Sequence, residues 1–509
     1  MITGRRFVAL LAATLVFRFW LASVFPMSGD EAYFVGWGRS LDWGYYDHPP
    51  MVGWWLAALL EIQAVEWWLR LPSILLPGIL ALGVLRALPY LAPGIDDERR
   101  YGIAALILLA PVNVWNVFIT TDTPLIYFSV FSGLAWLRAA RDDDARWYLA
   151  AGLLLAGAVL SKYFAAFLGF TFLVEVLRRR TLRALTGLTL AYACVLPALV
   201  LMAWWNSEHC WTNYMFNFVN RHGDAGWSLK TPLLYVATLL YMLSPPLLWL
   251  AATRRTQHRS ASADFSGVPG LALLAWVPFG LFALLSLVKQ VGLHWLLAFV
   301  PFALIWTGLR LQLATLRRLG VFFLGFAALH VALILLVSLF PLERWQTTRL
   351  YDGIVLSFEH QALARELAPY RDGSLGPWTL AMDGYSNAVT LGYNLRQQVI
   401  VFGEGSSYAR QDDLLTDFRR LAGKNILILR ESAPNMDDYR PYFSRLGVDS
   451  FEIRGARFWR VKGEGFDYPA YRDTVLSTVK QKYYALPAWL PQRGCPLCDR
   501  YFPEQACHR

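Results

Sequence analysis

Long apolar segments, separated by short polar or aromatic loops, fill the first two thirds of the chain. Each segment approaches the roughly 20 residues that a helix needs to cross a bilayer. The segments cover residues 7–25, 67–88, 101–119, 124–140, 147–160, 163–177, 184–205, 232–252, 269–288, 293–309 and 319–340. This pattern predicts an all-α membrane domain over residues 1–340 with about 11 transmembrane helices.

Two regions depart from this series. Residues 26–66 form a long loop of alternating aromatic and polar positions that includes Trp54-Trp55, and we expect interfacial helices there. After residue 340 the apolar runs shorten and charged residues become frequent. Strands are expected at residues 378–382, 398–402, 425–429 and 458–461, and helices at 356–368 and 411–421. Residues 341–509 are therefore predicted to form a small α/β domain.

Composition agrees with a membrane protein, because 56% of the residues are hydrophobic and the mean hydropathy is +0.36. The net charge of +10 would also suit a nucleic-acid partner. However, most arginines outside the C-terminal domain lie in alternate loops between the apolar segments: Arg5, Arg6, Arg86, Arg99, Arg100, Arg138, Arg141, Arg146, Arg178, Arg179, Arg180, Arg183, Arg254, Arg255, Arg259, Arg310, Arg317 and Arg318. The positive-inside rule places these loops in the cytoplasm. The charge is therefore a topology signal in a lipid bilayer, and no nucleic-acid partner is expected.

This topology places the remaining loops and residues 341–509 outside, with the first apolar segment retained as an uncleaved span. The acidic motifs then converge on the external side, because Asp30, Glu31 and Asp47 lie in the first external loop and Asp122 lies in a short external turn. Charges at this depth are costly to place and usually functional. A carboxylate here could take a proton from an acceptor hydroxyl.

Basic side chains also reach the external ends of the spans: Lys162, His209, Arg221, Lys289 and His294. Such cations can hold a phosphate leaving group. The chain has neither a P-loop nor a GxGxxG motif, so a lipid phosphate is the expected form of an activated donor.

Simpler roles remain open for several of these residues. Asp30 and Glu31 could cap an interfacial helix or face water, Asp122 could cap the next helix, and Asp47 could be a solvated loop residue. Arg221 and Lys289 could anchor span ends at lipid headgroups. The histidines could be ordinary interface residues. Asp47, His48, His209 and His294 have the side chains of a zinc site, but the sequence does not fix their distances. A divalent metal therefore stays possible, and no cofactor is certain.

The external motifs together resemble a known family. They are Gly29-Asp30-Glu31-Ala32-Tyr33, Trp43-Gly44-Tyr45-Tyr46-Asp47-His48-Pro49-Pro50, Thr121-Asp122-Thr123-Pro124, and Trp205-Asn206 with His209 and Trp211. The series is similar to the bacterial branch of the dolichyl-phosphate-mannose–protein mannosyltransferase superfamily, which includes the lipid A aminoarabinose transferase and lipopolysaccharide galacturonosyl transferases. The resemblance extends over the membrane domain and implies a GT-C fold and a polyprenyl-phosphate-linked sugar donor.

The resemblance also implies roles for individual residues. Asp30 would be the aspartate at the reaction centre and the general base of an inverting reaction. Glu31, Asp47 and Asp122 are further candidate catalytic residues, because they converge on the same side. His48 stands where a lysine near the donor phosphate is expected, and a histidine is only partly protonated near neutral pH. Donor-phosphate binding is therefore assigned to His48, Lys162, Arg221 and Lys289 together. Tyr33, Tyr46, His209 and His294 would bind substrate.

The expected function is transfer of a sugar to a cell-envelope acceptor, with lipid A or lipopolysaccharide core favoured. The protein would be a multi-pass protein of the bacterial inner membrane, with its active site and C-terminal domain facing the periplasm. A protein O-glycosyltransferase with the same donor type is the nearest alternative. A transporter or flippase for lipid-linked sugars is disfavoured. Its ionisable residues should lie near the bilayer midplane, whereas those of this chain cluster at one face. A structural subunit of an envelope complex is a third alternative.

The cysteines near the C-terminus form a separate pattern. Cys495-Pro496-Leu497-Cys498 is followed by Cys507-His508, which could suggest zinc. The spacing to Cys507 is too short for common zinc fingers, and an external location favours oxidation. A structural disulfide or unused thiols are therefore expected ahead of a metal site.

Overall fold

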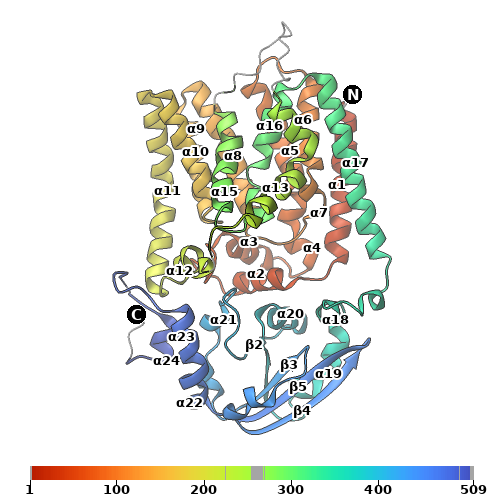
Figure 1. Ribbon diagram of the computed structural model, residues 1–509, viewed down its shortest axis with the longest axis vertical. Helices are drawn as coiled ribbons and strands as arrows, with labels where there is room; N and C mark the ends of the chain where they lie inside the picture. The colour runs from red at the N-terminus through yellow and green to blue at the C-terminus, as the bar shows by residue number, and fades with distance from the viewer. Residues whose placement is uncertain (1–2, 224, 254–267, 269, 492, 505–509) are drawn as a thin grey trace.

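A computed structural model describes residues 3–223, 225–253, 268, 270–491 and 493–504, and consists of a helical bundle with a small α/β domain beneath it (Figure 1). The longer bundle helices are α1 (Gly4–Val24), α5 (Leu71–Leu91), α6 (Asp97–Leu109), α8 (Asp122–Asp142), α9 (Ala145–Val159), α10 (Ala165–Arg179), α11 (Leu182–Glu208), α13 (Lys230–Leu243), α14 (Pro245–Ala252), α15 (Leu271–Ser286), α16 (Val300–Arg310) and α17 (Leu313–Ser338). The expected helical character of the first 340 residues is therefore confirmed.

Several of these helices are long and apolar enough to cross a membrane. Among the described residues they are α1, α5, α11 and α17, and α13 with α14 would add one more span bent by 98°. The bend falls at Ser244, directly before Pro245 and Pro246, which cannot continue the hydrogen bonding of the preceding helix. These helices support a membrane domain, whereas the count of 11 spans stays a prediction.

Small residues allow the helices to pack closely. A Cβ atom added to Gly152 of α9 would lie 2.6 Å from the Cα atom of Ala191 in α11. One added to Gly157 would lie 2.7 Å from the ring of Phe128 in α8. Such close packing is typical of helices in lipid, and it fixes the positions of the helix ends that carry the loops.

Short helices lie between the bundle and the C-terminal domain. The segment expected to be the first external loop forms α2 (Gly29–Arg39), α3 (Met51–Leu60) and α4 (Glu66–Leu69), and other loops form α7 (Pro111–Trp115) and α12 (Thr212–Phe218). Figure 1 shows α2 lying across the lower end of the bundle, directly above α20 (Tyr385–Leu395). Helices therefore occur where interfacial helices were expected.

The C-terminal domain contains one mixed sheet with the strand order β2-β1-β3-β5-β4. Its strands are β1 (Trp378–Met382), β2 (Ile400–Val401), β3 (Asn425–Arg430), β4 (Phe443–Ile453) and β5 (Ala456–Phe466). Strand β1 is parallel to β2 and β3, and β5 is antiparallel to β3 and β4. The remaining helices are α18 (Tyr351–Phe358), α19 (His360–Arg371), α21 (Asp412–Leu415), α22 (Tyr468–Tyr471), α23 (Ser477–Tyr483) and α24 (Pro496–Tyr501).

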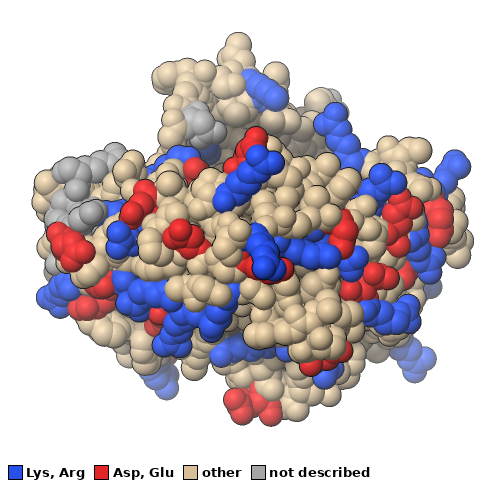
Figure 2. Space-filling view, turned by 90° about the horizontal axis from the view of Figure 1, so that it is seen from below, with Lys and Arg blue, Asp and Glu red and all other residues tan. Residues whose placement is uncertain are grey.

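Strand β3 is buried on both faces, which explains its unbroken apolar run. Leu427 and Leu429 pack with α18, α19 and α20, whereas Ile426 and Ile428 pack with α22, α23 and α24. Figure 2 shows the molecule from the side of the C-terminal domain. Basic and acidic side chains both occur over this face.

The expected strands at 378–382, 398–402, 425–429 and 458–461 all overlap observed strands, although the second is shorter. Strand β4 was missed, because its edge position leaves many polar residues exposed. The expected helix at 356–368 is wrong in its bounds, since α18 ends and α19 begins within it. The expected helix at 411–421 is also wrong, because α21 and a 3-10 turn at Phe418–Leu421 divide that segment.

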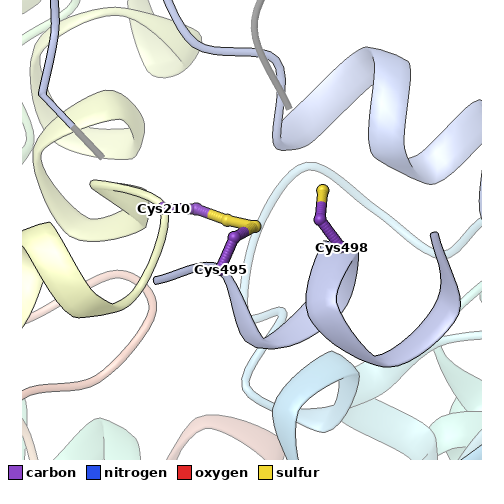
Figure 3. Close-up of side chains that lie close together, drawn as sticks. All are labelled: Cys210, Cys495 and Cys498. Carbon is purple, nitrogen blue, oxygen red and sulfur yellow. A yellow bond between two sulfur atoms is a disulfide. The ribbon is translucent and has the colours of Figure 1, made fainter. Parts of the chain in front are cut away.

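A disulfide joins the two parts of the chain. Cys210, in the turn between α11 and α12, is bonded to Cys495, which precedes α24 (Figure 3). Cys498 of α24 lies beside the same pair, and the sulfur atoms of the three cysteines lie within 4.8 Å of one another. A disulfide, one of the two forms expected for these cysteines, is therefore present, although its partner from the bundle was not foreseen. Cys507 and His508 lie outside the described residues.

Candidate functional site

A polar cavity of about 520 Å³ lies where the bundle meets the C-terminal domain. It is lined by residues from widely separated segments that the sequence had singled out: Asp30, Tyr33, Asp47, His48, Asp122, Lys162, Arg221 and His294. The fold therefore brings most of the predicted site residues together in one place.

Asp30 reaches the cavity from the first turn of α2. Ser28 caps this helix, and the side chains of Ser28 and Glu31 form a capping box with each other's backbone N–H groups. Asp30, Tyr33 and Phe34 then share one face of α2, because residues three and four positions apart lie one above the other on a helix. The carboxylate of Asp30 is exposed, and its Oδ1 accepts a hydrogen bond of 3.0 Å from the Tyr385 hydroxyl.

Asp47 and His48 enter the cavity from the loop after α2. The Tyr33 hydroxyl donates to Asp47 Oδ1 at 3.1 Å, and His48 Nδ1 lies 3.4 Å from Asp47 Oδ2. Asn217 of α12 donates to the Asp47 carbonyl oxygen at 2.9 Å. The loop is therefore held from both α2 and α12, and the Asp47 carboxylate has a defined orientation.

Asp122 and Lys162 form a buried ion pair at the wall of the cavity. Lys162 Nζ lies 2.8 and 2.9 Å from the two carboxylate oxygens of Asp122. Only 4% of Asp122 and 6% of Lys162 is exposed. Each charge largely neutralises the other, so Lys162 is less available to a phosphate than its position alone suggests.

Arg221 supplies a cation to the cavity from a 3-10 turn at Asn220–His222. Its guanidinium stacks 5.0 Å from the ring centre of Trp295, and within the described segments it makes no ion pair. Lys289 Nζ donates to the Arg221 carbonyl oxygen at 2.7 Å. Burial lowers the pKa of the Arg221 guanidinium, but an arginine still remains protonated near neutral pH.

His294 lies beside these charges in the lining of the cavity. Its imidazole can donate or accept a hydrogen bond, whereas Arg221 supplies positive charge.

A second cavity of about 440 Å³ adjoins the first and is mainly apolar. It shares Lys162 and Arg221 with the polar cavity. Its other lining residues are Val159, Tyr163, Phe164, Ala166, Phe167, Leu199, Tyr214, Asn217, Phe218, His222, Leu285 and Trp295. A ligand with a charged group at the junction could therefore place an apolar chain on one side and a polar group on the other.

Some predicted site residues do not line either cavity. Tyr46 is buried against Phe216 and Tyr484, and His209 stacks on Trp205 at 4.1 Å. Lys289 braces the backbone of Arg221, as described above. His209 is thus separated from Asp47, His48 and His294, and the described side chains of these four residues form no metal-binding cluster.

Glu31 also lies outside the cavity, in a buried ion pair with Arg70. Its carboxylate accepts hydrogen bonds of 2.8 and 2.7 Å from Arg70 and one of 3.0 Å from the Ile119 N–H. Both charged side chains are fully buried. This geometry indicates that Glu31 joins α2 to α5 and to the loop before Asp122, rather than reacting with substrate.

We expect Glu31→Gln to lower stability with little change in the kcat of the folded protein. The substitution weakens a buried, charge-assisted hydrogen-bond network, which costs about 1.5–3 kcal/mol. Thermal unfolding in detergent measures stability, and steady-state kinetics with one substrate varied at a time measure kcat. The exposed Glu61→Gln is the matched control. A large loss of kcat without loss of stability would contradict the structural role.

The C-terminal domain contributes residues that sequence reasoning missed. Tyr385, Tyr408 and Ala409 line the polar cavity, and the Gln411 N–H donates to the Tyr33 hydroxyl at 3.2 Å. Tyr385 follows β1, and the segment 408–411 follows β2. The carboxyl ends of parallel strands are common places for binding sites, so this placement after the expected strands was the available signal.

The chain is similar to known proteins in sequence and in fold. Residues 47–205 match the family model of dolichyl-phosphate-mannose-protein mannosyltransferase. The chain is 26% identical over 276 residues to the lipid A galacturonosyltransferase RgtD of Rhizobium johnstonii, a match covering 52% of this chain and 55% of RgtD. The matched region therefore spans about half the length of that relative.

The fold is similar to that of ArnT from Cupriavidus metallidurans. Crystal structures of ArnT bound to undecaprenyl phosphate and in the apo state give TM-scores of 0.58 and 0.57 at 16% identity. Each match covers 89% of this chain and 97% of ArnT. The resemblance to the superfamily is therefore confirmed, and the chain has the GT-C type of fold.

Proposed function

We propose that this chain is a membrane glycosyltransferase that moves a sugar from a polyprenyl-phosphate donor to a cell-envelope acceptor, with lipid A or lipopolysaccharide core as the acceptor. The relative RgtD bears the name of a lipid A galacturonosyltransferase, and one ArnT structure contains undecaprenyl phosphate. Under this proposal the protein crosses the bacterial inner membrane about 11 times, with the cavity and the C-terminal domain on the periplasmic side.

The observation that carries the proposal is the junction of the polar and apolar cavities at Arg221 and Lys162. A polyprenyl phosphate could place its phosphate at Arg221, its prenyl chain in the apolar cavity and its sugar toward Asp30. A charge-assisted contact from arginine suits a phosphate oxygen. His294 and His48 would contact polar groups of the donor from the same wall.

The reaction follows from these positions. Asp30 takes the proton of an acceptor hydroxyl, and the acceptor oxygen forms a bond to the anomeric carbon of the sugar. The bond between that carbon and the phosphate oxygen breaks, and the polyprenyl phosphate leaves with the electron pair. Arg221 stabilises the charge that develops on the leaving phosphate. Attack opposite the leaving group inverts the anomeric configuration.

The direct test uses purified protein in proteoliposomes with undecaprenyl-phosphate galacturonate and lipid A. The expected result is lipid A heavier by one hexuronic acid residue, detected by mass spectrometry. A peptide acceptor and lipopolysaccharide core are tested in parallel. Flip of the donor across the bilayer without transfer to any acceptor would overturn the proposal in favour of a transporter.

We expect Arg221→Met to weaken binding of undecaprenyl phosphate by about 10- to 100-fold, because it removes a charged hydrogen-bond donor from the site. Titration of the purified variants with undecaprenyl phosphate measures the dissociation constant. Arg39→Met is the matched control, since Arg39 is exposed and packs over Tyr393 instead of lining either cavity. Equal affinities for the wild type and Arg221→Met would exclude Arg221 as the phosphate contact.

A further inference from the structure

We infer that the C-terminal domain completes the reaction centre, and that Tyr385 is a positioning residue that orients Asp30 toward the acceptor. This inference rests on the proposed function, in which Asp30 is the base. The C-terminal domain would then orient a catalytic side chain in addition to packing against the bundle.

The contact between the domains is close at the residue beside Asp30. Helix α20 begins at Tyr385 and packs against the start of α2. A Cβ atom added to Gly29 would lie 2.0 Å from Ser386 Oγ and 3.0 Å from the Ser386 carbonyl oxygen. Only a glycine fits at this distance, so Gly29 allows the first turn of α20 to reach the carboxylate of Asp30.

The hydrogen bond from Tyr385 selects one oxygen of the Asp30 carboxylate. The hydroxyl donates to Oδ1, whereas Oδ2 makes no hydrogen bond to any residue that the structure describes. Burial and the adjacent Asp30 raise the pKa of Tyr385 well above its ordinary value, so the phenol keeps the proton that it donates. Oδ2 is left as the oxygen that accepts the proton of the substrate.

The same domain orients the second carboxylate of the cavity through Tyr33. The Gln411 N–H donates to the Tyr33 hydroxyl, which in turn donates to Asp47 Oδ1 at 3.1 Å. The rings of Tyr33 and Tyr385 meet edge to face, with their centres 5.7 Å apart. Both carboxylates are therefore held by tyrosines whose positions depend on the C-terminal domain.

The test compares Tyr385→Phe with the wild type and with Tyr393→Phe. Tyr393 lies on the same helix and in the same apolar cluster, but it does not line the cavity. Tyr385→Phe is expected to lower kcat by about 10- to 100-fold with little change in KM, since it removes one hydrogen bond to a charged group. The acidic limb of the pH–rate profile should move to higher pH, because that bond stabilises the ionised carboxylate.

A second measurement reports on Asp30 without the reaction. Esterification by a diazo reagent requires a protonated carboxyl group, and fragment mass spectra can locate the ester at Asp30. The other titratable groups facing this cavity are Asp47, His48, Asp122, Lys162, Arg221, His294, Tyr33 and Tyr408, all of which are unchanged in the variant. The pH midpoint of Asp30 labelling should therefore rise in Tyr385→Phe and stay unchanged in Tyr393→Phe.

The outcomes separate this inference from the proposed function. An unchanged labelling midpoint in Tyr385→Phe would overturn the positioning role, even if the rate of transfer fell. A raised midpoint together with a lower kcat supports it. If the wild type transferred no sugar while the midpoint still rose, the proposed function would fail but the contact between Tyr385 and Asp30 would stand.

Discussion

Asp30→Asn is expected to lower kcat for sugar transfer by about 10²- to 10⁴-fold, the usual contribution of a general base. The substitution keeps the shape of the side chain and an oxygen that can accept from Tyr385, but the amide cannot take a proton from the acceptor. Because Asp30 is exposed at the cavity, the variant should fold normally. Donor binding should also persist, since the phosphate is assigned to Arg221.

Steady-state transfer by purified protein and titration with undecaprenyl phosphate measure these effects separately. Asp42→Asn is the matched control from the loop after α2. Asp42 accepts a hydrogen bond from the Trp205 indole N–H and does not line the cavity. Both variants should unfold at the wild-type temperature. Wild-type kcat in Asp30→Asn would remove this residue from the mechanism, and Asp47 would become the next candidate for the base.

Lys162→Met is expected to destabilise the protein by about 3–5 kcal/mol, because it leaves the buried Asp122 carboxylate without its partner. The pair is nearly inaccessible, with both Nζ–oxygen distances below 3 Å. Lys230→Met is the control, since Lys230 is exposed at the start of α13. The midpoint of thermal unfolding in detergent should fall only in Lys162→Met.

The double variant Asp122→Asn/Lys162→Met separates the cost of an unpaired charge from the value of the pair. Without the buried charges, it should recover much of the lost stability, since neutral replacements of buried ion pairs are often tolerated. Transfer should remain impaired, because both residues line the polar cavity. If the double variant were as unstable as the single one, the loss would come from packing and not from the isolated carboxylate.

The sequence was sufficient for the membrane domain and for much of the cavity lining. Long apolar segments predict helices, and the charged residues in alternate loops between them lie together where the bundle meets the C-terminal domain. Asp30, Asp47, Asp122 and Lys162 were found in this way, and they meet in one cavity. The identity of their partners was not predictable, because Asp122 begins α8 whereas Lys162 lies in the turn between α9 and α10.

Other features depended on tertiary contacts that leave no local pattern. Glu31 stands beside Asp30 in sequence but faces Arg70 instead of the cavity, since neighbouring residues on a helix point in different directions. Tyr385 reaches Asp30 only because the C-terminal domain docks on α2. The pairing of Cys210 with Cys495 joins residues 285 positions apart, so spacing alone could not reveal it.

Mass spectrometry of lipid A, core oligosaccharide and envelope glycoproteins from a deletion strain tests the central claim most directly. The strain is complemented with the wild type or with Asp30→Asn at matched expression. The account predicts that one sugar on lipid A or the core disappears in the deletion strain, returns with the wild type and stays absent with Asp30→Asn. Unchanged glycans in the deletion strain, or full restoration by Asp30→Asn, would contradict it.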